Sequence, residues 1–262
     1  MRTTALIVLF TLAALPLHAQ GPQDMERDSW SGPISPGSVI RIDNPYGDIR
    51  LRHGGSENNL EVAAIFQQLA IDGSRLELET EIGDDAAVIT IARIALNGEP
   101  TTKVPRGDKA RVDVAIMVPE GTTVEARGTN GLIEAHGVHT DVDLQTTGGR
   151  IRVAKHGGRI KAHTDRGAME ITLVTGVTKK PQHLSSVTGS ITVFTPADND
   201  LDITMATSGT MTTDFTLMVE HHDHEEPNKK ATAVVGDGGP MLEITSKRGE
   251  IALRRVVTED TN

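Results

Sequence analysis

A short phrase centred on glycine recurs through the second half of the chain, and it constrains the fold more than any other feature of the sequence. Successive copies are 18, 18, 22, 20 and 40 residues apart, and the last step is about two periods long. The glycines are Gly131, Gly149, Gly167, Gly189, Gly209 and Gly249. The residues two positions after them are all apolar: Ile133, Ile151, Met169, Ile191, Met211 and Ile251. A repeat of about 20 residues indicates similar units stacked on one another.

Each unit has the pattern of two short strands. Apolar and polar residues alternate after each glycine, which is typical of a strand with one buried face. A second alternating segment is visible at 142–144, 160–162, 201–203 and 242–244. Twenty extended residues at about 3.3 Å each suit one winding, and windings about 4.8 Å apart place equivalent residues in columns. We therefore predict an all-β fold, a right-handed, single-stranded parallel β-solenoid with coils of about 20 residues. Constant spacing disfavours the alternative, an antiparallel sandwich.

Stacking of this kind makes two columns easy to predict. The polar residues between the apolar ones would point outward, in the order Glu134, Arg152, Glu170, Thr192 and Thr212. Opposite charges would pair among the first three, and the two threonines would face each other. The glycines are expected at corners that need either a positive φ or a close approach of two backbones.

The chain before the repeats divides by composition. We predict a signal peptide (1–19), an extended leader (20–37), a strand-rich part that caps or begins the solenoid (38–120), a repeat body (121–257) and a tail (258–262). An inserted loop rich in His, Asp and Glu, around 219–239, interrupts the body. The signal assignment rests on a positive start, an apolar run and a small residue, Ala19, before the expected cut. An uncleaved anchor is the alternative, although the apolar run is short for a membrane span.

Strands are expected in the N-terminal part wherever Val, Ile and Thr alternate with polar residues. The segments are 49–51, 60–66, 76–78, 88–92 and 112–118. The stretch 61–70 also fits a short helix, but its alternation fits a strand equally well.

Three further phrases extend the pattern toward the N-terminus. They are NPYGDIRL at 44–51, VPEGTTVE at 118–125 and NGLIEA at 130–135. With the later units, they make the chain resemble the bacterial putative-adhesin family of exported β-solenoid proteins, over residues 38 to 255. The resemblance implies a right-handed parallel solenoid at the cell envelope, and it supplies no catalytic residues.

Composition excludes several classes of function. The chain has no cysteine, so it has neither disulfides nor thiolate chemistry. A net charge of −10 argues against binding nucleic acid through bulk charge. Aromatic residues make up 2% of the sequence, too few to line a groove with rings for stacking bases or sugars.

Three local features of the sequence are candidate sites. The tract 221–226 carries three histidines, His221, His222 and His224, which could converge on zinc, nickel or copper, but their spacing fits no standard site. Asp198, Asp200 and Asp202 could hold calcium, but such alternation also describes solvated carboxylates. Ser190 lacks a nucleophile elbow and occupies an ordinary repeat position. We therefore predict no catalytic, cofactor-binding or metal-binding residues.

The function that these patterns predict is binding. We expect a non-enzymatic, adhesin-like exported protein, periplasmic or at the cell surface, that presents a rigid surface to a protein or glycan of the envelope. Nucleic acid is not expected as a partner, nor a transmembrane segment in the mature chain. The alternatives are a polysaccharide lyase or hydrolase on the same scaffold, which would need converging carboxylates in a groove, and an envelope-stress regulatory module.

Overall fold

The computed structural model describes residues 25–54, 58–67, 72–174 and 180–256, and within them every regular element is a β-strand. The predicted signal peptide, residues 20–24 of the leader and the predicted tail lie outside the described residues. The strands form two mixed sheets, of ten and eleven strands, which we call the first and the second sheet. The fold is thus all-β, as predicted.

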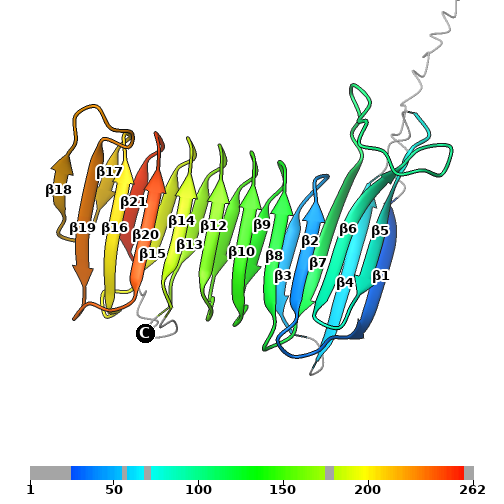
Figure 1. Cartoon of the computed structure of the whole chain (residues 1–262), viewed down its shortest axis with the longest axis horizontal. Coiled ribbons are helices and arrows are strands. Elements are labelled where there is room, and N and C mark those ends of the chain that lie inside the picture. The colour runs from blue at the N-terminus through cyan, green and yellow to red at the C-terminus, as the bar shows by residue number, and fades with distance from the viewer. Residues whose placement is uncertain (1–24, 55–57, 68–71, 175–179, 257–262) are drawn as a thin grey trace, which may run out of the picture.

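Both sheets run the length of an elongated molecule (Figure 1). The first sheet has the order β1 (Met25–Pro33), β4 (Asn59–Gln67), β7 (Arg111–Val118), β3 (Ile49–His53), β9 (Ile133–His136), β11 (Ile151–Ala154), β13 (Met169–Thr172), β15 (Ile191–Thr195), β21 (Ile251–Arg255) and β17 (Met211–Thr213). The second has the order β18 (Met218–His221), β19 (Lys229–Val235), β16 (Leu201–Thr207), β20 (Met241–Ser246), β14 (Gln182–Ser186), β12 (Ile160–Thr164), β10 (Asp141–Thr146), β8 (Thr123–Gly128), β2 (Val39–Asn44), β6 (Ala86–Ile94) and β5 (Arg75–Ile82). These bounds include all five N-terminal strands expected from alternation, and 59–67 is a strand rather than a helix.

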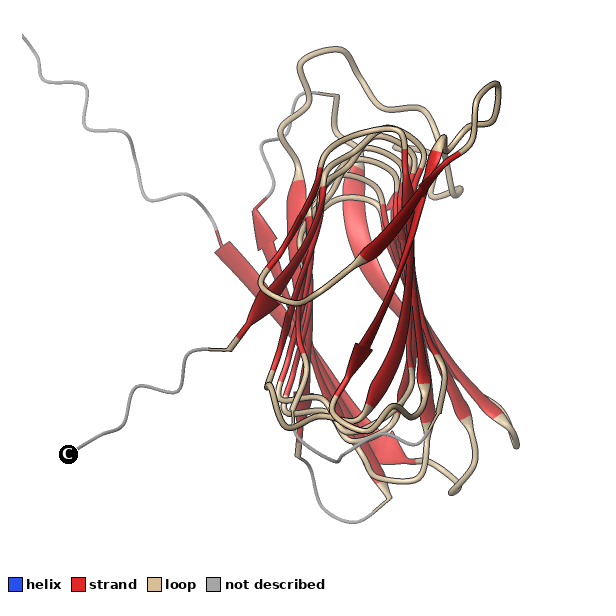
Figure 2. Cartoon of the chain, turned by 90° about the vertical axis from the view of Figure 1, so that its left-hand side faces the viewer, coloured by secondary structure: helices blue, strands red, loops and turns tan. Residues whose placement is uncertain are grey.

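From β8 to β15 the chain crosses between the sheets after every strand. Each strand therefore pairs in parallel with the equivalent strand of the next unit, and Figure 2 shows the two sheets facing each other with turns joining them at both edges. The register places Ile151 opposite both Ile133 and Met169. Ile191 continues the column beyond Met169. The predicted apolar column is confirmed for these units.

The core lies between the sheets and is one continuous cluster. Period-2 alternation turns one face of every strand inward, as in β10, whose Val142, Leu144 and Thr146 are buried between half-exposed neighbours. The inward residues are mostly Ile, Val, Leu and Ala, whose burial supplies about 25 cal/mol per Å² of apolar surface removed from water. The sheets are therefore held together by columns of aliphatic side chains.

A column of glycines lines one edge of the stack. A Cβ added to Gly149 would overlap the carbonyl oxygen of Gly131, and one added to Gly167 would overlap that of Gly149. The same contact continues to Gly189 and Gly249. None of these glycines has a positive φ. Of the two reasons predicted for the glycines, close approach of backbones is the correct one.

Buried hydroxyl groups fix the same corners. Thr146, Thr164 and Ser246 each accept a hydrogen bond from the backbone N–H three residues later, at 3.1, 3.0 and 2.8 Å. Each N–H belongs to a glycine of the column, so a hydroxyl and a glycine together define each corner. A buried N–H that is left without any acceptor destabilises the folded state by about 1–3 kcal/mol.

The last unit does not stack in sequence order. Strand β21 lies between β15 and β17, and β20 lies between β14 and β16. Ala252 consequently separates Thr192 from Thr212, so the predicted contact between these threonines is wrong. The second-sheet register also differs, because Ile203 rather than Leu201 pairs with Leu242. The chain builds one outer unit, leaves the stack and then returns to fill the position inside it.

The N-terminal end is closed by antiparallel strands. β1 pairs with β4, β4 with β7, and β5 with β6, all antiparallel. Residues 25–33 of the expected leader thus supply an edge strand, whereas β2 and β3, from the part expected to cap or begin the stack, pair in parallel with β8 and β9. Antiparallel strands can follow one another through tight turns, which suits the end of a stack that no further unit covers.

The expected inserted loop is instead a hairpin. Its strands β18 and β19 pair antiparallel, and β19 pairs antiparallel with β16. Alternation explains the strand, since Ala231, Ala233 and Val235 are buried and the residues between them are exposed. Within the part of the chain that the structure describes, no helix is long and apolar enough to cross a membrane.

Candidate functional site

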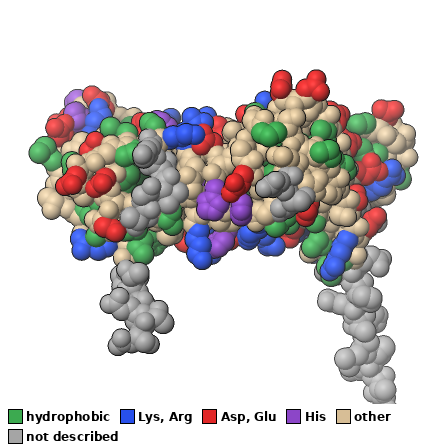
Figure 3. Space-filling model, turned by 90° about the horizontal axis from the view of Figure 1, so that it is seen from below, with side chains coloured by type: hydrophobic (Ala, Val, Ile, Leu, Met, Phe, Trp, Pro, Cys, Tyr) green, Lys and Arg blue, Asp and Glu red, His purple; other side chains and the backbone are tan. Residues whose placement is uncertain are grey.

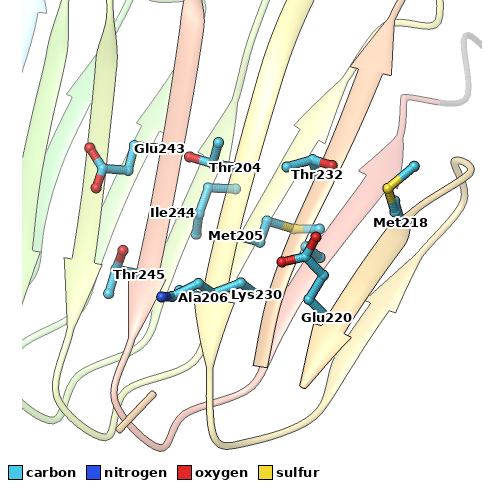
Figure 4. Close-up of a pocket in the computed structure, with 11 residues that line it drawn as sticks. Thr204, Met205, Ala206, Met218, Glu220, Lys230, Thr232, Glu243, Ile244 and Thr245 are labelled. Carbon is cyan, nitrogen blue, oxygen red and sulfur yellow. The ribbon is translucent and has the colours of Figure 1, made fainter. Parts of the chain in front are cut away.

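A groove of about 320 Å³ opens on the outer face of the second sheet, at the end that carries the hairpin. Figure 4 shows its lining, which comes from β16, β18, β19 and β20. The lining residues are Thr204, Met205, Ala206, Met218, Glu220, Lys230, Ala231, Thr232, Glu243, Ile244 and Thr245. We call this feature the hairpin groove.

Register explains why the sheet is hollowed here. Thr204 of β16 lies between Thr232 of β19 and Glu243 of β20. Two residues further along β16, on the same outer face, Ala206 lies between Lys230 and Thr245. Small side chains on the central strand therefore form a floor between longer ones. The far wall is β18, which carries Met218 opposite Thr232.

The groove combines apolar surface with charges. Met218 is 69% exposed and adds an uncovered apolar side chain to the groove. On the opposite wall, Glu243 lies 2.9 Å from His183. Lys230 lies 3.2 Å from Glu225 at the hairpin tip, so its charge is partly compensated. Such a surface is complementary to a partner that carries both apolar groups and hydrogen-bonding groups.

The two lining carboxylates are not arranged for glycoside hydrolysis. Glu243 is on β20 and Glu220 on β18, three strand positions apart. With neighbouring strands about 4.8 Å apart, this separation is about 14 Å. Paired glycosidase carboxylates are about 5–9.5 Å apart. The groove thus holds the residue types that the enzyme alternative needs, but not their spacing.

The histidine tract lies at the end of the groove wall and in the hairpin turn. His221 is the last residue of β18, and His222 lies 3.6 Å from Glu220. Glu226 instead binds Arg248, whose guanidinium lowers the pKa of that carboxyl through a hydrogen bond and its charge. Among the described residues, no three His, Asp or Glu side chains gather where they could hold a metal ion.

The remaining sequence candidates have ordinary surroundings. Asp200 accepts a hydrogen bond from the Asp237 N–H at 2.9 Å, and this bond ties β16 to the turn after β19. Asp202 lies between Val234 and Met241 on the outer face. The backbone oxygen of Ser190 accepts the Met169 N–H at 2.8 Å, as expected for a repeat position.

The charged column expected on the first sheet lies on its outer face. Arg152 is directly between Glu134 and Glu170 and lies 3.2 Å from the Glu170 carboxylate. Glu134 pairs with Arg52 of β3. The predicted ladder of compensating charges is confirmed, and its carboxylates are engaged by arginines.

Several histidines lie along one edge of the stack, which Figure 3 shows from below. The rings of His53 and His139 are 5.1 Å apart, and Glu120 lies 4.0 Å from His53. His156 is 5% exposed, and burial lowers its pKa to about 4. Its place in the preceding unit is taken by Val138, whose carbonyl accepts the Gly157 N–H. Aligning the units shows this imidazole at an apolar position, a signal that sequence reasoning missed.

The chain is similar to known proteins at the level of solved structures. No protein-family model matches the sequence, and no curated protein matches it either. The chain is similar to a putative cell adhesion protein from Clostridium sporogenes, with 13% identity over 88% of this chain and 100% of that one, and a TM-score of 0.45. It is also similar to a putative adhesin from Bacteroides fragilis, with 13% identity over 88% and 97% of the two chains and a TM-score of 0.34. The TM-scores are too low for these likenesses to support an argument about function.

Proposed function

We propose that the chain is an exported, non-enzymatic, adhesin-like envelope protein that binds a protein or glycan partner through the hairpin groove. In this proposal the stacked units form a right-handed parallel β-solenoid of the putative-adhesin type, with residues 1–19 as its signal peptide. The observation that carries the proposal is a hollowed, partly apolar surface where the β18–β19 hairpin interrupts the repeat.

The outer faces elsewhere support the same assignment. Ion pairs such as Arg152–Glu170, Lys161–Asp143 and Arg41–Glu125 cover both sheets. Exposed pairs of this type add little stability, but they keep long strands soluble and non-adhesive. Against this background, the hairpin groove is a surface on which a partner can bury apolar area. A rigid scaffold also lowers the entropy cost of binding.

The groove can be tested by filling it. Ala206→Arg places a long side chain over the floor, whereas Thr192→Arg puts the same side chain on the outer face of the first sheet as a matched control. Each purified protein is mixed with an envelope fraction of the source cells and sedimented. We expect the wild type and Thr192→Arg to sediment with the fraction and Ala206→Arg to stay in solution.

Two results would contradict the proposal. One is that Ala206→Arg sediments like the wild type, which would move binding away from the groove. The other is release of reducing ends or unsaturated sugars from a polysaccharide panel, which would establish an enzyme. Export is tested separately by sequencing the N-terminus of the protein recovered from cells, which is expected to begin at Gln20.

A further inference from the structure

A second cavity, of about 590 Å³, lies in the N-terminal half of the stack and shares no residue with the hairpin groove. It opens between two corners of the stack and the long connection from β6 to β7. The corners contribute Pro45, Tyr46, Gly47, Thr129, Asn130 and Gly131. The connection and the start of β7 contribute Thr102, Val104, Asp108, Ala110 and Arg111. We call it the corner pocket.

The wall of the corner pocket is held in place by a buried ion pair. Arg93 of β6 binds Asp108 of the connection, and their side chains are 2% and 5% exposed. Arg93 also donates to the Ser74 hydroxyl at 2.6 Å, and its guanidinium lies 5.4 Å from the centre of the Tyr46 ring. The loop and the ring are therefore fixed relative to each other before any ligand arrives.

Arg111 is also held and neutralised. It lies 2.8 Å from Asp48 and 2.9 Å from Asp113, whose charges raise the pKa of its guanidinium against the opposing effect of burial. The lining contains one cation, Arg111, and one anion, Asp108, and both are already paired. Charge therefore favours neither an anionic nor a cationic ligand.

The groups left unpaired are neutral. Tyr46, Thr129 and Asn130 are among the residues that line the pocket, and within the described residues no hydrogen bond engages their side-chain hydroxyls or amide. An amide and two hydroxyls offer both donors and acceptors. Tyr46 adds the apolar surface of a ring, and it is the only tyrosine of the chain. Such a combination complements a compact molecule that carries several hydroxyls.

We propose that the corner pocket binds a neutral saccharide of one or two rings. Its volume lies within the usual range of about 300–1,000 Å³ for ligand pockets. The unpaired groups would bond sugar hydroxyls, and the Tyr46 ring would contact C–H groups of the sugar. One ring is enough for a pocket, although the sequence has too few to line a groove. The inference names a ligand class for the binding role proposed above and to that extent rests on it, but it concerns a different site.

Saturation-transfer NMR on the full mature chain tests this inference, with glucose and N-acetylglucosamine as probes and glucuronate as a charged comparator. We expect transfer to at least one neutral sugar and weaker transfer to glucuronate. Tyr46→Phe keeps the ring, and Asn130→Ala keeps the corner glycine, so neither change disturbs the stack. Because each removes one neutral hydrogen bond, each is expected to weaken the affinity about twofold to tenfold.

The matched control is Thr188→Ala, since Thr188 occupies the position of Asn130 at a later corner. It is expected to leave the affinity unchanged, as is the groove variant Ala206→Arg. Absence of transfer to both neutral sugars would overturn the inference, and so would unchanged affinity in both pocket variants. If sugar binding is absent while Ala206→Arg still abolishes sedimentation, the corner pocket fails and the proposed function stands. If sugar binding is present while Ala206→Arg sediments like the wild type, the corner pocket stands and the proposed role of the hairpin groove fails.

Discussion

His156 supplies the sharpest test of how the stack is packed. Its imidazole occupies a position that is apolar in the preceding unit, and neither ring nitrogen has a partner with hydrogen-bond geometry. Burial lowers the pKa from 6.5 to about 4, while the Arg159 backbone and the Asp141 carboxylate oppose this effect only in part. The folded protein therefore holds the ring neutral at a pH where the unfolded chain protonates it.

The sign of the effect follows from proton binding. Between pH 6.5 and about 4 the unfolded state binds more protons at this site than the folded state, so the free energy of unfolding falls as the pH falls. A lowering of the pKa from 6.5 to about 4 corresponds to about 3 kcal/mol. Below about pH 4 this contribution stays constant. For a domain with a stability of about 5–15 kcal/mol, the loss is large.

Urea denaturation from pH 7.5 to 4 measures this contribution when the wild type is compared with His156→Val. Valine is chosen because Val138 fills the equivalent place. Between pH 7 and 4, the variant is expected to lose about 3 kcal/mol less than the wild type. Contacts with Arg159 and Lys180 lower the pKa of Asp141 against desolvation, so its stabilising contribution is lost in both proteins mainly below about pH 4. Parallel profiles for the wild type and His156→Val would refute the reasoning.

Three further outcomes are expected from thermal or urea denaturation. Gly149→Ala should lose several kcal/mol or fail to fold, because its Cβ would overlap a backbone oxygen, whereas Gly148→Ala meets only the end of a side chain and should cost far less; equal losses would contradict the glycine column. Thr164→Val should lose about 1–3 kcal/mol because a buried N–H loses its acceptor, and Thr164→Ser should recover most of it; a stable valine variant would argue against the hydroxyl corners. Asp108→Ala should cost about 3–5 kcal/mol by leaving Arg93 charged and buried, and an unchanged midpoint would show that this pair is not buried in solution.

The sequence predicts the fold best where one unit resembles the next. The spacing of Gly131, Gly149 and Gly167 predicted the apolar column that follows them, and the register confirms it. Local patterns carry this information because every strand has one inward face. For the same reason, the alternation of Glu134, Arg152 and Glu170 predicts a column of opposite charges on the outer face.

Order along the stack could not be predicted in the same way. Nothing local distinguishes a unit that follows β15 directly from one that returns to it after a hairpin, since both have the same inward residues. The charged tip of the hairpin dominates its composition and predicts a loop, while Ala231 and Ala233 are weak signals of burial. The corner pocket depends on Arg93 meeting Asp108 across a long connection, a contact that no spacing rule predicts.

The return of the last unit matters for the proposed site. Because β20 fills the position beside β14, β16 is left as the outermost parallel strand, and the hairpin pairs with it to form the groove. If the units stacked in sequence order, β16 would be an inner strand of the second sheet. Thr204 and Ala206 would then not lie next to the hairpin. The order of the rungs is therefore the claim on which the site depends.

Cysteine cross-linking measures this order directly, because the chain has no cysteine of its own. Thr192 and Ala252 are paired on neighbouring strands, about 4.8 Å apart, whereas Thr192 and Thr212 are two strands apart, at about 10 Å. Disulfides need Cα atoms within about 7 Å. On mild oxidation, the double variant Thr192→Cys/Ala252→Cys is expected to form an intramolecular disulfide, detected by loss of free thiol and a mass shift, and Thr192→Cys/Thr212→Cys is expected to stay reduced. The opposite pattern would contradict the rung order and, with it, the groove.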